Sequence, residues 1–541
     1  MINASSSKKV GASLADSLSD MLQRSTRGSL ILLLGKIVST LVAALGMILV
    51  ARFLGATSYG LLTVAMIPVS IAALFRDLGV TSALIRYVAQ YHSEGRTAEA
   101  KAMMRAGLIL NAAVGASLSL VTFSLSGILA VQVFHQPGLA RLIKIASAAI
   151  LAESVLSTSR SIFVGFERME LHSLTMVIES ALKSVSAPLL VFLGLGAFGA
   201  ILGETAAVAV TALIGIAIVG TVLYRGGVHR GAAIGLLRAC WILLDYGYPL
   251  FLSVLLSGAL SRFYDFLMAV YVDASMIGNY KAALNFSVLI TFLTMPIATV
   301  LFPLFSRLDV GEDRMLRIVF QNSVKYAALV TVPATMALMV LSGQLVRVIY
   351  GSSYQSAPLL LQLYIVNFLF VGLGGLVVGS FLMGQGRTKI NFLMQLINLC
   401  IGVPLGFVLI PRYGIIGLLL TMLIASKPNL FYALWWIRRN FGFTLNWMAS
   451  AKIYLSAALA SSATFILLFF LKSGDWIELL LGGGLFLLIY SLLVPLTGAL
   501  DDGDIRNLRD IMGGLGPLTS LFNLFMSFAA RLTRRTGSEG L

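Results

Sequence analysis

Charged residues are scarce in this sequence of 541 residues: only 11% are Asp, Glu, Lys or Arg, whereas 58% are hydrophobic. Soluble domains average about 25% charged and about 45–50% apolar residues. A chain with so little charge cannot cover a folded surface with groups that water solvates, so lipid is its predicted solvent. The composition therefore excludes an ordinary soluble fold and predicts an all-α polytopic membrane protein.

Cysteine and histidine are also rare. Cys240 and Cys400 are the two cysteines, and the four histidines are scattered, so neither a disulfide framework nor a metal site is expected. Residues 1–27 lack the apolar core of a cleavable signal peptide. GSLILLLGKI (28–37) has the wrong spacing for a nucleotide-binding phosphate loop and lies in an apolar run. We expect no cofactor, no catalytic residues and no ATP hydrolysis by this chain.

Apolar runs separated by charged or Pro/Gly breaks predict about fourteen membrane-spanning helices. Their approximate ranges are 29–51, 60–78, 106–131, 145–165, 172–193, 198–223, 247–270, 277–303, 322–345, 357–382, 390–410, 413–437, 453–472 and 476–497. If the N-terminus is cytoplasmic, 27 of the 39 Lys and Arg residues fall in cytoplasmic segments and six in outside segments. This bias predicts a multi-pass protein of the cell membrane with both termini in the cytoplasm. It also explains the net charge of +16 without a nucleic-acid partner.

An internal repeat relates the two halves of the chain. At an offset of 218 residues, ARFLGATSYGLLTVA (51–65) corresponds to AVYVDASMIGNYKAA (269–283), and GAFG (196–199) corresponds to GIIG (414–417). GFERMEL (165–171) likewise corresponds to GQGRTKI (384–390). Each half holds six predicted spans, an even number, so the two halves have the same orientation in the membrane and form parallel repeats.

The repeat and the spans together predict two parallel six-helix lobes and an extra C-terminal helix pair. The expected divisions are a cytoplasmic N-terminal segment (1–27), an N-lobe (28–223), a basic linker (224–246), a C-lobe (247–437), the extra pair (453–497) and a cytoplasmic tail (501–541). Within the tail, LTSLFNLFMSFAARLTRR (518–535) is amphipathic and basic, as in helices that lie on an anionic leaflet. Because one chain contains both lobes, we expect it to act as a monomer.

Several motifs resemble those of the O-antigen and polysaccharide flippases, within the superfamily that also contains lipid II flippases and multidrug exporters. FLGATSYGLLTVA (53–65) resembles their signature after the first span, and LFRDLGVTSALIRYVAQY (74–91) resembles the cytoplasmic end of their second helix. Asp265 ahead of VDASMIGNYKAA, and PIATVLFPLFSRL (296–308), are similar to their second half. DDGDIRNLRDIMGGLGPL (501–518) resembles an archaeal branch. The resemblance covers about residues 25–500.

This resemblance implies transport of a polyprenyl-linked oligosaccharide from the cytoplasmic to the outer leaflet by alternating access. A multidrug or cation-coupled exporter is an alternative, although such exporters usually have twelve spans. A lipid II-type flippase is a near relative with the same number of spans. A membrane-bound glycosyltransferase would need a sizeable outside loop with catalytic motifs, and the outside segments are short. A coupling ion is compatible with the sequence, which does not identify it.

Ionisable residues inside apolar spans are expensive in lipid and are therefore candidates for substrate binding. Lys36 and Arg262 are the first choices for a phosphate group, since lysine offers a point charge and arginine a bidentate fork. Asp265, three residues after Arg262, is expected to orient it or to serve as a protonation or cation-coupling site. Tyr264 is a candidate for stacking on a sugar, although an interfacial aromatic belt explains it equally well.

Four further charged residues are secondary candidates. Glu179 and Lys183, at i and i+4, are expected to neutralise one another on an inward face. Lys281 lies near an interface, where its ammonium group can extend into water at little cost. Lys325 begins a predicted span, and Lys427 lies inside another.

Overall fold

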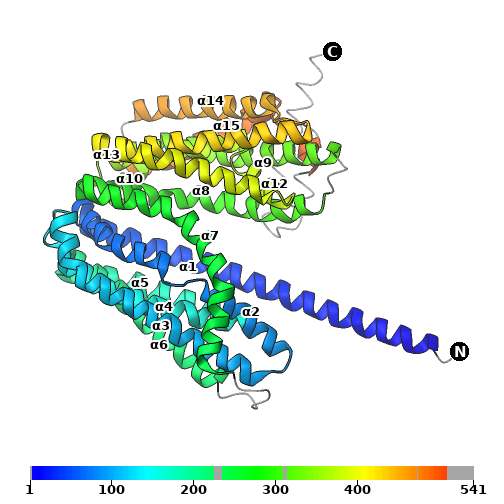
Figure 1. Cartoon of the computed structure of the whole chain (residues 1–541). Coiled ribbons are helices and arrows are strands. Elements are labelled where there is room, and N and C mark those ends of the chain that lie inside the picture. The colour runs from blue at the N-terminus through cyan, green and yellow to red at the C-terminus, as the bar shows by residue number, and fades with distance from the viewer. Residues whose placement is uncertain (1–2, 225–233, 309–312, 472, 502, 508–541) are drawn as a thin grey trace. The chain divides into compact units, whose positions relative to one another are not determined.

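The computed structural model describes residues 3–224, 234–308, 313–471, 473–501 and 503–507 (Figure 1). Within these ranges the chain folds into helices, without a strand. The α-helices are α1 (Asn3–Phe75), α2 (Val80–Ser93), α3 (Thr97–Ile128), α4 (Leu139–Gly165), α5 (Met169–Leu190), α6 (Gly196–Ile218), α7 (Leu236–Tyr271), α8 (Ala274–Ser306), α9 (Asp313–Val340), α10 (Ser342–Tyr350), α11 (Ala357–Leu369), α12 (Val377–Gly384), α13 (Thr388–Phe441), α14 (Trp447–Leu471) and α15 (Asp475–Leu496). Short π-helical turns extend α3, α5 and α6, and a 3₁₀ turn follows α11.

The predicted spans coincide with these helices. Nine continuous helices in the described ranges are long and apolar enough to cross a membrane, and the bent pair α11 and α12 makes a tenth. Three of the nine, of 46, 53 and 54 residues, are long enough for two crossings each, since one crossing needs about 20 residues. With α4, which covers the predicted range 145–165, all fourteen predicted ranges lie on helices apart from a few end residues. The all-α polytopic fold is confirmed.

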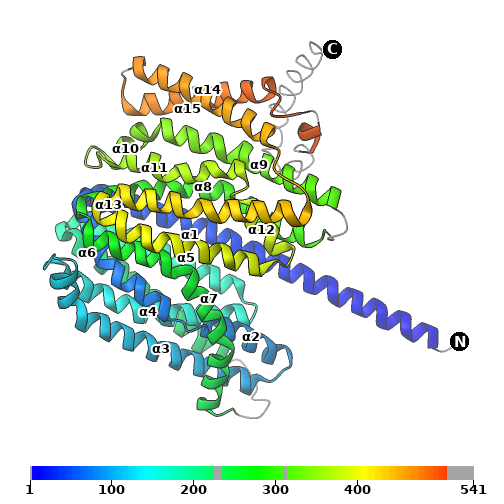
Figure 2. The ribbon, with the colours of Figure 1, turned by 45° about the horizontal axis from the view of Figure 1, so that its top comes forward.

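The chain separates into two compact units, Met1–Gly278 and Asn279–Leu541. In the first unit α3, α4, α5 and α6 run beside one another, α1 packs along α5, and α7 packs on α1, α2 and α3 (Figures 1 and 2). In the second unit α14 pairs with α15 and α9, and α11 contacts α9 and α13. Part of the predicted linker, at 225–233, and the predicted amphipathic segment 518–535 lie outside the described residues.

Backbone geometry supports the internal repeat. Gly196 (φ 55°, ψ −143°) and Gly414 (φ 57°, ψ −131°), 218 residues apart, share a conformation that is essentially restricted to glycine. GFER and GQGR form the same turn: the N–H of Arg168 donates to the Phe163 carbonyl, and the N–H of Arg387 donates to the Leu382 carbonyl, both over 2.8 Å. These are helix-ending Schellman motifs. The two turns are 219 rather than 218 residues apart. The second half is therefore one residue longer than the first between the repeated segments 51–65 and 269–283 and these turns.

The signature itself forms a close helix crossing within the first unit. A methyl group on Gly60 would lie 1.7 Å from the carbonyl oxygen of Ala274, and one on Gly278 would lie 1.8 Å from that of Ala56. Ala56 corresponds to Ala274 and Gly60 to Gly278 in the repeat, so the two contacts are reciprocal. Small residues four apart let helix backbones approach this closely in membranes.

Candidate functional site

A network of charged side chains lies inside the first unit. Nη2 of Arg160, on α4, lies 2.8 Å from Oε2 of Glu179 on α5, and Nζ of Lys183 binds the other oxygen of the same carboxylate. Arg160 also donates to the backbone carbonyl of Thr175 over 2.8 Å. Glu179 is thus held by two cations, and its side chain is only 13% exposed. The expected i, i+4 pair of Glu179 and Lys183 is present, as part of a larger group.

The network continues more loosely through Glu153 on α4. One oxygen of this carboxylate lies 3.6 Å from Nζ of Lys183, and the other lies 3.8 Å from Nη1 of Arg76, which follows α1. Glu204 on α6 also interacts electrostatically with Lys183. Arg76, Arg160 and Lys183 therefore face three carboxylates, so the group is balanced in charge. Such a group can remain in lipid without a bound anion.

Arg262 and Asp265 also form an ion pair, on α7. Nη1 of Arg262 lies 2.9 Å from Oδ2 of Asp265, and the two side chains are 37% and 15% exposed. The hydroxyl of Tyr264, the residue directly before Asp265, is buried and has no hydrogen-bond partner among the described residues. Arg262 and Asp265, three residues apart, are thus in contact as expected. Tyr264 lies on the buried side of the same helix.

The remaining sequence candidates lie apart from these groups. Lys36 is exposed on α1 and has no ion-pair partner among the residues that the structure describes. Lys281 is half-buried on α8, with its Nζ 5.8 Å from the ring centroid of Tyr280. Neither residue contributes to the network of the first unit, and Lys281 has further interactions of its own.

Lys325 on α9 fixes the segment that follows α15. Its ammonium group binds the carboxylate of Asp504 and lies 3.5 Å from Oδ2 of Asp501. Tyr326 donates to the other oxygen of Asp504 over 3.1 Å. Burial would raise the pKa of the Asp501 carboxyl, but the hydrogen bond from the Asp504 backbone N–H and the charge of Lys325 outweigh it, so this pKa lies below its ordinary value. The surroundings of Lys325 indicate a structural contact.

Lys427, on α13 in the second unit, differs in its contacts from the ion-paired Lys183, Arg262 and Lys325. Its Nζ lies 3.1 Å from Oδ1 of Asn367 and 3.4 Å from the ring centroid of Phe370, and no carboxylate of the described residues pairs with it. Both contacts are to neutral groups. An ammonium group that is half-buried in an apolar span without a counter-charge is costly, so Lys427 is a candidate for binding an anion from outside the chain.

The sequence around Lys427 indicates that its charge lacks a nearby partner. No Asp or Glu occurs between residues 314 and 474, so no nearby carboxylate in the sequence can neutralise the basic residues of that stretch. Acidic residues beyond it reach two of them: Asp501 and Asp504 reach Lys325, and Oδ1 of Asp475 lies 2.8 Å from Nε of Arg347. The acid-free stretch thus leaves Lys427, in the second unit, without a carboxylate partner among the described residues.

Comparison with known proteins gives a consistent family. Residues 25–309, more than half of the chain, match the family model described as polysaccharide biosynthesis protein. The chain is 27% identical over 425 residues to the lipopolysaccharide biosynthesis protein WzxC of Escherichia coli (strain K12), covering 73% of this chain and 80% of that protein. It is 21% identical over 389 residues to a putative O-antigen transporter of Shigella flexneri, covering 71% and 91%. The solved structure of the lipid II flippase MurJ in an inward closed conformation has the same fold, with a TM-score of 0.67 at 16% identity, over 86% of this chain and 99% of that one.

Proposed function

Because this chain belongs to the polysaccharide biosynthesis protein family, we propose that it is a transporter that moves a lipid-linked oligosaccharide from the cytoplasmic to the outer leaflet of the cell membrane. The physical task is to carry sugar and phosphate groups across hydrocarbon. Those polar groups lose water without replacement in lipid, at a cost of several kcal/mol or more for each. The lipid tail can stay in the bilayer throughout, so only the headgroup needs a polar path.

The observation that carries this proposal is the unneutralised ammonium group of Lys427. A phosphate or diphosphate linkage supplies the negative charge that this span lacks, and a charge-assisted hydrogen bond is stronger in a low-dielectric environment. Transport of a cationic drug, the alternative for the same superfamily, would place a second positive charge beside Lys427. We therefore favour the anionic glycolipid as the substrate.

Other sequence candidates take supporting roles in this proposal. Lys36, exposed on α1, and Arg262 are proposed as further phosphate ligands, with Asp265 holding the guanidinium of Arg262 in place over 2.9 Å. Tyr264 is proposed to meet sugar when its buried hydroxyl becomes accessible. The network around Glu179 is proposed to be structural. One chain is proposed to suffice for transport, and both termini to lie in the cytoplasm.

The decisive experiment measures where lipid-linked oligosaccharide lies in cells depleted of this protein, with an impermeant reagent that labels the outer leaflet. Intact glycolipid should accumulate unlabelled on the cytoplasmic side. If outer-leaflet glycolipid is unchanged while a small toxic cation accumulates in the cells, the protein is a small-molecule exporter and the proposed function is wrong. If only the peptidoglycan precursor lipid II accumulates inside, the protein is a lipid II flippase.

The same assay tests the site. Lys427→Ala should reduce labelling of outer-leaflet glycolipid about tenfold or more, the effect of losing one charged hydrogen bond, while membrane abundance is unchanged. Lys389→Ala is the matched control, because Lys389 is exposed at the start of the same helix. Normal transport by Lys427→Ala would show that this ammonium group does not hold the substrate.

A further inference from the structure

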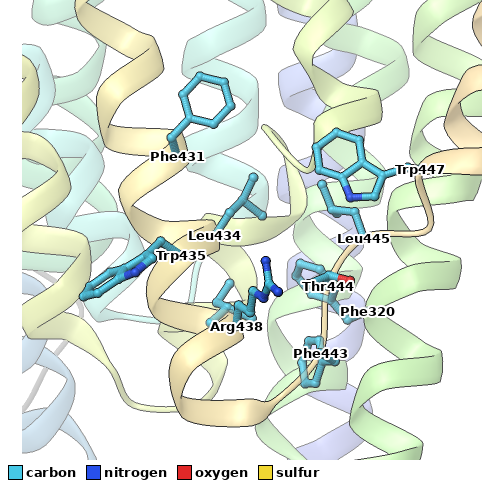
Figure 3. A pocket seen from close by; sticks show the side chains of 10 residues that line it. Phe320, Phe431, Leu434, Trp435, Arg438, Phe443, Thr444, Leu445 and Trp447 are labelled. Atoms are coloured by element: carbon cyan, nitrogen blue, oxygen red, sulfur yellow. The ribbon is translucent and has the colours of Figure 1, made fainter.

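Arg438, which has no carboxylate partner among the described residues, lies at the end of α13 in an aromatic pocket. The pocket has a volume of about 260 Å³ and lies between the last turns of α13, the segment 442–446, the start of α14 and Phe320 of α9. Figure 3 shows the guanidinium group of Arg438 pointing into the space between α13 and this segment. The pocket is therefore a cavity with one charged group.

The charge of Arg438 is not neutralised by any carboxylate in the part of the chain that the structure describes. No carboxylate of the described residues forms an ion pair with its guanidinium group, and the sequence from 314 to 474 contains no acidic residue. Two neighbouring arginines are accommodated differently, on aromatic faces: Arg439 lies 5.4 Å from the ring centroid of Trp435, and Arg387 lies 5.9 Å from that of Trp436. Arg438 alone of these three lines the pocket.

The walls of the pocket combine a rigid base with an exposed rim. Phe320, Phe443 and Leu445 are 1%, 3% and 5% exposed, and the two phenylalanines belong to a cluster of packed rings. Trp435 and Trp447, on the rim, are 52% and 54% exposed. Helix α13 ends at Phe441 and α14 begins at Trp447, so the pocket lies where the chain turns at a membrane surface. Tryptophan is enriched at that depth because one end of its ring is apolar and the other polar.

We propose that this pocket binds the phosphate group of an anionic phospholipid from the surrounding leaflet, with Arg438 holding the phosphate and an acyl chain lying against the aromatic wall. The charge of Arg438 selects an anion, and its planar fork matches a phosphate. The apolar base selects a ligand that is partly hydrocarbon. A cavity of about 260 Å³ is too small for a whole oligosaccharide and has room for a phosphate group with the first part of an acyl chain. The site is thus separate from the proposed transport of glycolipid and does not depend on it.

The test uses the full-length protein in a neutral detergent and the fluorescence of its own tryptophans. Phosphatidylglycerol with brominated acyl chains is titrated in, and quenching is compared with that by equally brominated phosphatidylcholine. The wild type should be quenched at lower concentrations of the anionic lipid. Arg438→Gln should raise the concentration of phosphatidylglycerol that gives half-maximal quenching about tenfold, since it removes a charged phosphate ligand. This concentration should then be close to the one for phosphatidylcholine.

Two further variants make the result specific. Arg439→Gln is the matched control, because it removes an adjacent charge that stacks on Trp435, and it should change half-saturation by less than about twofold. Thr444→Glu places a carboxylate at an exposed position of the pocket and should abolish the preference even if Arg438→Gln does not fold. Equal losses in the two arginine variants would show diffuse surface attraction instead. Equal quenching of the wild type by both lipids would exclude an anion site. If a polyprenyl phosphate displaces the brominated phosphatidylglycerol at about one tenth of the concentration that unlabelled phosphatidylglycerol needs, the occupant is the lipid carrier of the substrate and the proposal is wrong.

Discussion

Glu179 pairs with two cations at once, so it should contribute more to the stability of the first unit than a carboxylate in an exposed ion pair does. Removal of its charge by Glu179→Gln would leave Arg160 and Lys183 with surplus positive charge inside the first unit. Breaking a buried ion pair by removing one partner costs about 3–5 kcal/mol. We expect Glu179→Gln to lower the thermal unfolding midpoint of the detergent-solubilised protein markedly, as measured by light scattering or intrinsic fluorescence.

Glu170→Gln provides the matched control for this substitution. Glu170 pairs with Arg168 over 3.3 Å near the start of the same helix, but both side chains are more than half exposed. Such pairs contribute about 0–1 kcal/mol. Equal shifts in the midpoint for the two variants would show that the network around Glu179 is solvated and does not stabilise the unit.

Asp501 predicts a pH dependence at the end of α15. Because its pKa in the folded protein lies below the ordinary value of about 3.9, its contribution to stability is present above that value and is lost as pH falls through the folded pKa. Asp501→Asn should reduce the hydrogen-exchange protection of the amide of Ile505, which donates to the Asp501 carbonyl over 3.1 Å. The difference from the wild type should be constant above about pH 5 and vanish toward lower pH. A difference that persists unchanged at acidic pH would contradict the assigned ion pair with Lys325.

At the residue scale, contacts within one helix were predictable from the sequence and contacts between helices were not. Glu179 with Lys183, and Arg262 with Asp265, follow from helical spacing. Arg160 reaches Glu179 from another helix, and Lys427 reaches Asn367 over 60 positions, so only the folded chain brings them together. The lack of acidic residues between 314 and 474 is visible in the sequence, but the sequence does not show which cations of that stretch find a carboxylate from outside it, as Lys325 and Arg347 do, and which do not.

At the scale of elements, the reciprocal crossing of α1 and the start of α8 depends on two glycines. A side chain at Gly60 would meet the backbone of Ala274, and backbone cannot move aside as a flexible side chain can. We expect Gly60→Val to abolish folded protein, measured as the fraction of monodisperse protein in size-exclusion chromatography after extraction. Gly278→Val should behave alike, because its contact with Ala56 is the counterpart in the repeat.

The control for this crossing is Gly127→Val, since Gly127 lies in α3 with no heavy atom within 4 Å of an added methyl group. A β-branched residue costs only a few tenths of a kcal/mol relative to other side chains in a helix, so this variant should remain monodisperse. If Gly60→Val and Gly127→Val are extracted equally well, the close approach does not hold these helices together.

The elements themselves were largely predictable, because long apolar runs allow one interpretation in lipid. The positions and angles of the breaks between consecutive helices were harder to predict. A single non-helical residue, Gly55 (φ 70°, ψ 172°), separates two predicted spans within α1, and within α13 the break falls at Gly414, one residue inside the predicted span 413–437. Conversely, the predicted span 357–382 is bent by 49° between α11 and α12. Apolar composition does not report the angle between consecutive helical segments, which depends on packing.

At the scale of the whole molecule, the repeat and the charge bias make one joint prediction about orientation. Two halves with equal, even numbers of spans share an orientation, and an additional pair of helices returns the chain to its starting side. Two basic residues, Arg438 and Arg439, precede α14 and Lys452 lies near its start, whereas the turn between α14 and α15 contains one basic residue, Lys472. Basic segments remain in the cytoplasm, so this turn should lie outside and both termini inside.

Reporter fusions test that orientation. Alkaline phosphatase fused after Ser473 should be active, because the enzyme folds only outside the cytoplasm, and the same fusion after Asn446 should be inactive. Green fluorescent protein fused after Leu541 should fluoresce. The opposite pattern at all three positions would invert the molecule, and would place the pocket of Arg438 on the outer leaflet. Activity after both Ser473 and Asn446 would mean that α14 does not cross the membrane, which would break the even count on which the two cytoplasmic termini depend.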